Sequence, residues 1–210
     1  MKNKYSRIVS SIFLAVVLIF GSVMTANAQE PDTEDSIAAL AQEAAARTTE
    51  NYLIIKDIET GEETRINLGD SVVTVENIGN GIRVTDTVDL EEALGKIPMP
   101  MIDQSVANTL SGWRGTVSIT YTDDGTWASL NYITGNWRRV SGSYNMTNAG
   151  ATYGQSLGTN SRSASTTFGS QFSANTTWPK GKYGRGHFLG GNISGRVNGK
   201  IITVVCNHNL

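Results

Sequence analysis

Residues that could do chemistry are sparse in the second half of the chain. Cys206 and His208 stand two apart near the C-terminus, so on a strand they would face the same side, and His187 could join them across a sheet. That spacing suits a zinc site, or a thiol activated by a histidine. We favour the simpler interpretation that Cys206 is a buried thiol and His208 an exposed terminal histidine, because such spacing is common. We therefore predict no metal, no cofactor and no catalytic residue, which favours a protein that is not an enzyme.

Catalysis by a carboxylate pair has little support in the same half. Asp123 and Asp124 are its two acids, and they stand next to each other before a glycine, as is typical of a turn. An enzyme would need acids from the first half, such as Asp70, Glu76 or Asp86, at an interface between the halves. Nothing in the spacing of these acids demands such an interface.

The remaining chemistry lies in basic and aromatic side chains. The segment 178–187 has the composition of a flexible loop and holds three fixed positive charges and two aromatic rings. Aromatic rings can stack on sugars or bases, and Lys and Arg pair with phosphate or carboxylate. Alternation along a strand would also place Trp137 and Arg139 on one face. The predicted ligand-binding residues are Trp178, Lys180, Lys182, Tyr183, Arg185, Trp137 and Arg139.

A simpler interpretation is that the tryptophans belong to the core and the basic residues keep the protein soluble. We favour the core for Trp113, Trp127 and Trp137. Trp178 stands beside a proline in an apparent loop, so it is the better candidate for a binding aromatic.

The N-terminus has the pattern of a secretory signal peptide over residues 1–28. Basic residues come first, an apolar run from Ile8 to Phe20 follows, and Ala26-Asn27-Ala28 offers small residues at the cleavage position. The apolar run is shorter than the roughly 20 residues that a spanning helix needs. We expect a secreted or cell-surface protein with no transmembrane segment after cleavage. Its single cysteine rules out an internal disulfide.

Charge divides the mature chain into two regions. Residues 29–110 hold 17 acidic and 5 basic residues, whereas residues 111–210 hold 2 acidic and 9 basic residues. All four tryptophans lie in the second region, and Pro98-Met99-Pro100 marks the change. We predict an acidic α+β region over 29–97, which is a possible pro-segment or accessory domain, a linker over 98–110 and a basic all-β domain over 111–210.

The acidic region is expected to form a helix, a small sheet of its own and a second short helix. The first helix is predicted over 31–47 with an alanine-rich apolar face, and the second over 89–94, where Asp89 can cap it. Strand formers alternate between turn signals, and Asn80-Gly81 indicates a hairpin. The predicted strands are 52–58, 64–68, 72–78 and 82–88.

The basic region is expected to be an antiparallel β-sandwich or small barrel. Apolar and polar residues alternate over 117–122, and Asn198-Gly199 predicts a hairpin between the last two strands. Gly135-Asn136 is interpreted as a turn between strands. The further predicted strands are 126–133, 137–146, 151–157, 165–172, 187–197 and 201–206. The fold class is therefore mainly β, preceded by a small α+β region.

Three functions are compatible with these features. The favoured one is an exported, non-catalytic binding protein whose basic domain contacts an anionic polymer, a polysaccharide or another surface protein. The alternative is a secreted cationic effector, bacteriocin-like or membrane-active, that residues 29–110 mask until they are removed. The third is the enzyme with a site between the halves. Export makes specific nucleic-acid binding an unlikely role, although the positive charge would cause non-specific binding.

Overall fold

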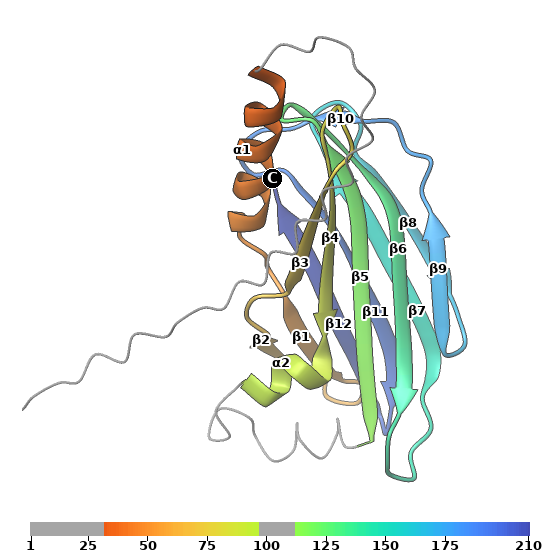
Figure 1. The fold of residues 1–210 in the computed structure, drawn as a ribbon. Coiled ribbons are helices and arrows are strands. Elements are labelled where there is room, and N and C mark those ends of the chain that lie inside the picture. The colour runs from red at the N-terminus through yellow and green to blue at the C-terminus, as the bar shows by residue number, and fades with distance from the viewer. Residues whose placement is uncertain (1–31, 97–111) are drawn as a thin grey trace, which may run out of the picture.

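The protein is a mainly-β sandwich of two antiparallel sheets with two helices, which confirms the predicted fold class (Figure 1). A computed structural model describes residues 32–96 and 112–210. The predicted signal peptide and linker lie outside these residues. The elements are α1 (Asp32–Ala46), β1 (Tyr52–Asp57), β2 (Glu63–Asn67), β3 (Val72–Asn77), β4 (Ile82–Asp89), α2 (Leu90–Lys96), β5 (Trp113–Asp123), β6 (Trp127–Arg139), β7 (Thr147–Ser156), β8 (Arg162–Thr167), β9 (Gln171–Asn175), β10 (Gly181–Lys182), β11 (Phe188–Val197) and β12 (Lys200–Asn209).

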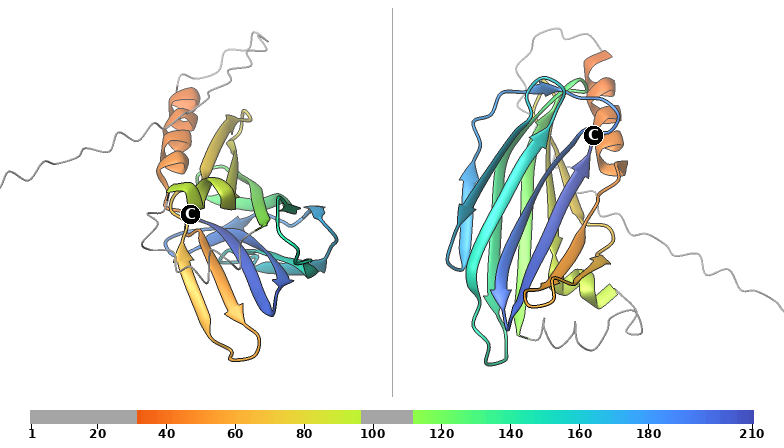
Figure 2. Two further views of the ribbon diagram at one scale, coloured as in Figure 1. Left: turned by 90° about the horizontal axis from the view of Figure 1, so that it is seen from below. Right: turned by 180° about the vertical axis from the view of Figure 1, so that it is seen from behind.

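Each sheet contains six strands. Sheet A has the order β2-β1-β12-β11-β7-β8, and sheet B has the order β10-β6-β5-β4-β3, with β9 also paired to β6. β11 and β12 of sheet A pack over β4 and β5 of sheet B. Seen from below, the two sheets diverge toward their β2 and β3 edges, and α2 lies between them (Figure 2). The C-terminal strand β12 is therefore central in its sheet.

Strands from the acidic and basic regions share both sheets. β1 pairs with β12 from Tyr52↔Val205 to Asp57↔Lys200, and β4 pairs with β5 from Ile82↔Asp123 onward. The expectation of a separate small sheet over 52–88 is therefore wrong. The two expected hairpins form, but β1–β2 joins sheet A and β3–β4 joins sheet B. Short-range turn signals identify hairpins, whereas their assignment to sheets depends on distant strands.

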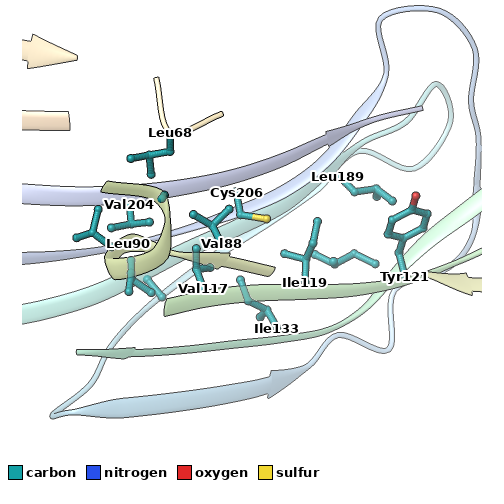
Figure 3. Close-up of a cluster of buried hydrophobic side chains, with 14 of the residues drawn as sticks. Leu68, Val88, Leu90, Val117, Ile119, Tyr121, Ile133, Leu189, Val204 and Cys206 are labelled. Carbon is teal, nitrogen blue, oxygen red and sulfur yellow. The ribbon is translucent and has the colours of Figure 1, made fainter. Parts of the chain in front are cut away.

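The core fills the space between the two sheets with inward-facing side chains from alternating positions (Figure 3). Two glycines let side chains of the opposite sheet approach closely: a Cβ on Gly135 would overlap Ile193, and one on Gly191 would overlap Ile133. The predicted turn at Gly135-Asn136 is thus wrong. β6 continues through it to Arg139, and the glycine serves close packing between sheets.

Both helices cover the sandwich, at positions close to those predicted. α1 packs its apolar face, including Ile37, Leu40 and the fully buried Ala44, beside β3 and β4. Asp89 caps α2, because its Oδ1 accepts hydrogen bonds from the backbone N–H groups of Glu91 and Glu92 at 2.9 and 3.2 Å. Within residues 32–96 and 112–210, no helix is long and apolar enough to cross a bilayer.

The shared sheets predict that residues 112–210 do not fold alone. A chain that begins at Gly112 would leave β5 and β12 each without one neighbour and would uncover Ile119, Ile202 and Val204. We expect such a chain to show no cooperative thermal transition by circular dichroism, whereas the longer chain shows one. A sharp transition in the truncated chain would contradict this arrangement.

Candidate functional site

A groove crosses the outward face of sheet A, over β7, β8, β11 and β12. It encloses about 430 Å³. Its floor is backbone, because Gly154 of β7 and Gly190 of β11 are cross-strand partners without side chains. A Cβ on Gly190 would overlap the side chain of Asn207, and one on Gly154 would lie 2.8 Å from the carbonyl oxygen of Arg162. Glycine at both positions therefore creates the groove.

Polar side chains and one exposed aromatic ring form the walls. Phe188 is 40% exposed although it begins a strand of the sheet. The amides of Asn192 and Asn207 have no hydrogen-bond partner among the residues that the structure describes, so they are available to a ligand. The remaining lining residues are Thr152, Tyr153, Gly154, Gln155, Ser156, Ser161, Arg162, Ser163, Gly190 and Gly191, and the lining includes no acid.

Positive charge gathers around one end of the groove. Arg162 lines it, and the loop that carries Arg185 leads directly into Phe188. The backbone N–H of Gly158, in the β7–β8 turn, donates to the carbonyl oxygen of Lys182 at 2.9 Å, which brings β10 against this end. Within 32–96 and 112–210, these three cations have no acidic partner. The groove is therefore neutral on its floor, and Arg162 supplies the positive charge of its lining, with Arg185 in the adjoining loop.

The structure places Trp137 in the core, as the sequence favours, but leaves Trp127 exposed. Trp178 is half-buried and stacks on Tyr153, with 5.8 Å between ring centroids. Trp137 is buried, and its Nε1 donates to the carbonyl oxygen of Ser194, so it is a core residue. Trp127 is 40% exposed beside Lys182, its cross-strand partner. Sequence reasoning placed Trp127 in the core and overlooked Phe188, because exposure depends on neighbours across the sheet.

The predicted basic loop is anchored rather than free along its length. Lys180 forms a 2.9 Å ion pair with Asp124, and β10 pairs with β6. Partial burial raises the pKa of Asp124, but hydrogen bonds from Lys180 and from the backbone of Trp127 outweigh that effect and lower it overall. Lys182 and Arg185 remain exposed. Arg139 also lies elsewhere, bonded to Asn145 in the β6–β7 connection.

Acids of the first half neutralise several bases of the second. Glu91 lies 3.0 Å from Arg138 and 3.8 Å from Arg114, and Asp57 lies 3.0 Å from Lys200. The unmatched charge of the second half is therefore smaller than its net charge indicates. Of the bases without an acidic partner in the described residues, Arg162 lines the groove, whereas Arg139 and Arg196 lie away from it.

A second polar cluster lies at the C-terminal end of α1, inside the sandwich. Arg47, whose side chain is 8% exposed, donates to Asp123 at 2.6 Å and to the hydroxyl of Tyr183 at 3.0 Å. Burial lowers the pKa of Arg47, but its hydrogen bond and charge interaction with Asp123 reverse this and raise it overall. Burial and the hydrogen bond that Tyr183 donates to Asp123 raise the pKa of Tyr183 to about 12. This cluster holds α1 and β10 to the β5 end.

The cluster continues into the core through a buried histidine. His208 Nδ1 lies 3.2 Å from Asp86 Oδ2, and both residues are fully buried. Cys206 faces the same interior, as its spacing from His208 predicts, and Tyr121 packs on the His208 ring (Figure 3 labels Tyr121 and Cys206). His187 does not join them, because its Nδ1 accepts from the Gly184 backbone in an exposed turn. A substrate has no path to this interior, so we assign it a structural role.

Catalytic arrangements do not emerge elsewhere in the described ranges. Asp70 is exposed in a loop, and Glu76 pairs with Arg83 on the solvent-exposed face of sheet B. Asp86 lies in the core, so these three acids share no cleft. Three or more metal-binding side chains do not gather anywhere within 32–96 and 112–210.

The segment 154–158, Gly-Gln-Ser-Leu-Gly, has the spacing of a nucleophile elbow, which the sequence predictions above do not include. An elbow needs a strand, a sharp turn and then a helix. Here β7 runs into a turn and then into β8. Ser156 also has no hydrogen bond to a histidine in the part of the chain that the structure describes. The segment therefore contributes Gly154 to the floor of the groove and the hydroxyl of Ser156 to its lining.

No protein family, curated protein or solved structure matches this chain. The function must therefore be argued from the groove and its surroundings.

The buried ion pair predicts a large loss of stability when its cation is removed. Arg47→Met keeps an apolar stem but leaves the carboxylate of Asp123 buried without a positive partner, which costs about 3 kcal/mol in the free energy of unfolding. The matched control is Arg83→Met, which breaks the exposed pair with Glu76 and costs less than about 1 kcal/mol. Urea denaturation measures both, and equal losses would show that the Arg47 pair is not specially buried.

Burial also predicts that Cys206 is unreactive in the folded protein. The thiol is fully buried, and desolvation, with Asp86 nearby, raises its pKa well above the usual value. We expect no alkylation by iodoacetamide at pH 9, where an exposed thiol is largely thiolate. Complete labelling in urea is the positive control, and mass spectrometry detects the adduct. Rapid labelling without urea would mean that the β12 end opens.

Proposed function

We propose that this protein is exported and binds, without catalysis, an anionic polysaccharide along the groove of sheet A. The observation that carries the proposal is the glycine floor at Gly154 and Gly190, flanked by the free amides of Asn192 and Asn207 and by exposed Phe188. An open groove of this kind admits an extended chain from either end.

The groups along the groove match the parts of a sugar chain. The ring of Phe188 offers an apolar face on which the C–H face of a sugar ring can stack. The amides of Asn192 and Asn207 each provide donors and an acceptor, which suits hydroxyl groups. Arg162 can form paired hydrogen bonds with a carboxylate or phosphate. The combination favours a polymer that bears both hydroxyl groups and negative charges.

Electrostatics favours an acidic polymer over a neutral one. The lining includes Arg162 and no acid, and the loop that carries Arg185 leads into Phe188 of the lining. Each exposed charge contact contributes only about 0–1 kcal/mol, so binding must combine several of them with stacking. The affinity should therefore fall as salt screens the charges.

The strand arrangement argues against the masked cationic effector. Releasing residues 111–210 would remove β1 and β4 from the sheets that they share with β12 and β5. The released part would lose strands and core side chains together rather than uncover a finished surface. Binding by the intact sandwich is therefore the function that we propose.

Retention on immobilised polygalacturonate tests the proposal, with dextran as the neutral control polymer. We expect retention on polygalacturonate at roughly 20 mM salt and release by roughly 500 mM salt. Phe188→Ala and Asn192→Ala should each weaken binding about fivefold to tenfold, through lost stacking and lost hydrogen bonds.

The matched control is Thr203→Ala, which changes an outward residue of β12 in the same sheet but outside the groove lining. It should bind like the unchanged protein. Equal retention of all variants, or no retention at low salt, would count against the groove as the binding site.

A further inference from the structure

The strand β8 forms an open edge of sheet A. β8 pairs with β7 on one side, and five of its six residues are exposed, with Ala164 half-buried. The backbone N–H of Phe168 donates to the carbonyl oxygen of Ala149 at 2.9 Å, which fixes the hydrogen-bonding phase of the pair. By alternation, Ser163, Ser165 and Thr167 point their N–H and C=O groups away from β7. Three residues thus offer outward backbone groups to a further strand, and among these groups the carbonyl oxygen of Thr167 also accepts from the Thr166 hydroxyl at 3.3 Å.

This edge lacks the features that usually keep edge strands apart. Residues 163–178 include no charged residue and no proline. The register between β7 and β8 is continuous, without a bulge. β8 and β9, the two edges at this side of the sandwich, both fall within this uncharged stretch (Figure 2).

The edges at β2, β3 and β10 are protected. β2 carries the charged residues Glu63 and Arg65. The hydrogen bonds between β1 and β2 leave the backbone N–H and C=O groups of these two residues pointing away from β1, at the open edge. Pairing of β2 with itself about its centre would place two Arg65 side chains opposite each other. β3 lies beside α1, and β10 is two residues long. The edge at β8 is therefore distinct in being both six residues long and unguarded.

We propose that β8 is a homodimer interface, in which β8 pairs antiparallel with β8 of a second copy about a two-fold axis at Ser165. The three outward backbone positions are symmetric about Ser165, so the pairing forms about six hydrogen bonds. Sheet A then continues without interruption into the sheet A of the partner copy.

The side chains fit this register. Ser165 lies opposite its own copy, and Ser163 lies opposite Thr167, so small hydroxyl side chains meet as they already do in the 3.0 Å contact between Thr152 and Ser165. The two copies of Arg162, the one charged residue of the strand, lie at opposite ends of the pair. No like charges face each other, in contrast to the β2 case.

The dimer would join the two grooves on one face. Ser163 and Arg162 line the groove and also belong to β8, so each groove lies beside the two-fold axis. A polymer long enough to reach both would bind with higher avidity than a short one. The interface itself does not depend on the proposed function, and mass measurements test it without any ligand.

Light scattering after size-exclusion chromatography, on purified protein from about 1 µM to about 500 µM, tests the interface. We expect the mass of two chains for the unchanged protein. Ser165→Pro removes the central outward N–H and leaves the bonds to β7 in place, so it should raise the dimer dissociation constant at least about 100-fold.

Two controls separate this edge from other causes. Ser165→Ala loses the hydroxyl but keeps the N–H, so it should remain dimeric. Ser173→Pro changes the corresponding outward position of β9, in the other sheet, and should also remain dimeric. A monomer for the unchanged protein at every concentration, a dimer for Ser165→Pro, or a monomer for Ser173→Pro would each overturn the proposal.

A charge pair keeps the test decisive if the proline variant does not fold. Ser165→Lys and Ser165→Glu each place like charges opposite one another in the dimer, so each should be monomeric alone. Mixed at low salt, the two should form a heterodimer that native mass spectrometry resolves. Dimers of either variant alone, or no heterodimer in the mixture, would exclude pairing at Ser165.

Discussion

Backbone hydrogen bonding between strands that lie far apart in the chain is the interaction on which the rest of this structure depends. β12 has β11 on one side and β1 on the other, and β5 has β6 and β4. The β12–β1 and β5–β4 pairings join strands from the two sides of the change in charge and composition near residue 100. Because both sheets draw strands from both regions, the acidic and basic segments form one core, and the surface is a property of the whole chain.

The polar interior at one end of the sandwich follows from that arrangement. Inward positions on β4, β5 and β12 carry Asp86, Asp123 and His208 where most inward positions carry aliphatic residues. Arg47 at the end of α1 provides a counter-charge for Asp123, and His208 lies against Asp86. Paired burial of this kind sets the position of α1 on the sandwich rather than adding much net stability. The other end is packed with aliphatic side chains and α2.

Much of the local structure can be predicted from the sequence, and the site cannot. Alternating residues and the Asn198-Gly199 turn indicate the strands and the last hairpin, because those signals are local. The groove depends on Gly154 facing Gly190 across two strands, which is a matter of register between distant segments. Exposure of Phe188 and of Trp127 depends in the same way on neighbours that alternation alone does not reveal.

The central place of the last strand bears on how the chain reaches this structure. Tyr52 pairs with Val205, so β1 gains its inner neighbour in sheet A only after residue 205 has been synthesised. Contacts between such distant residues slow folding, since a long loop must close before they form. Until then the β1–β2 hairpin and the inward face of β5 are uncovered. Sheet A therefore cannot be completed before the residues of β12 have been synthesised.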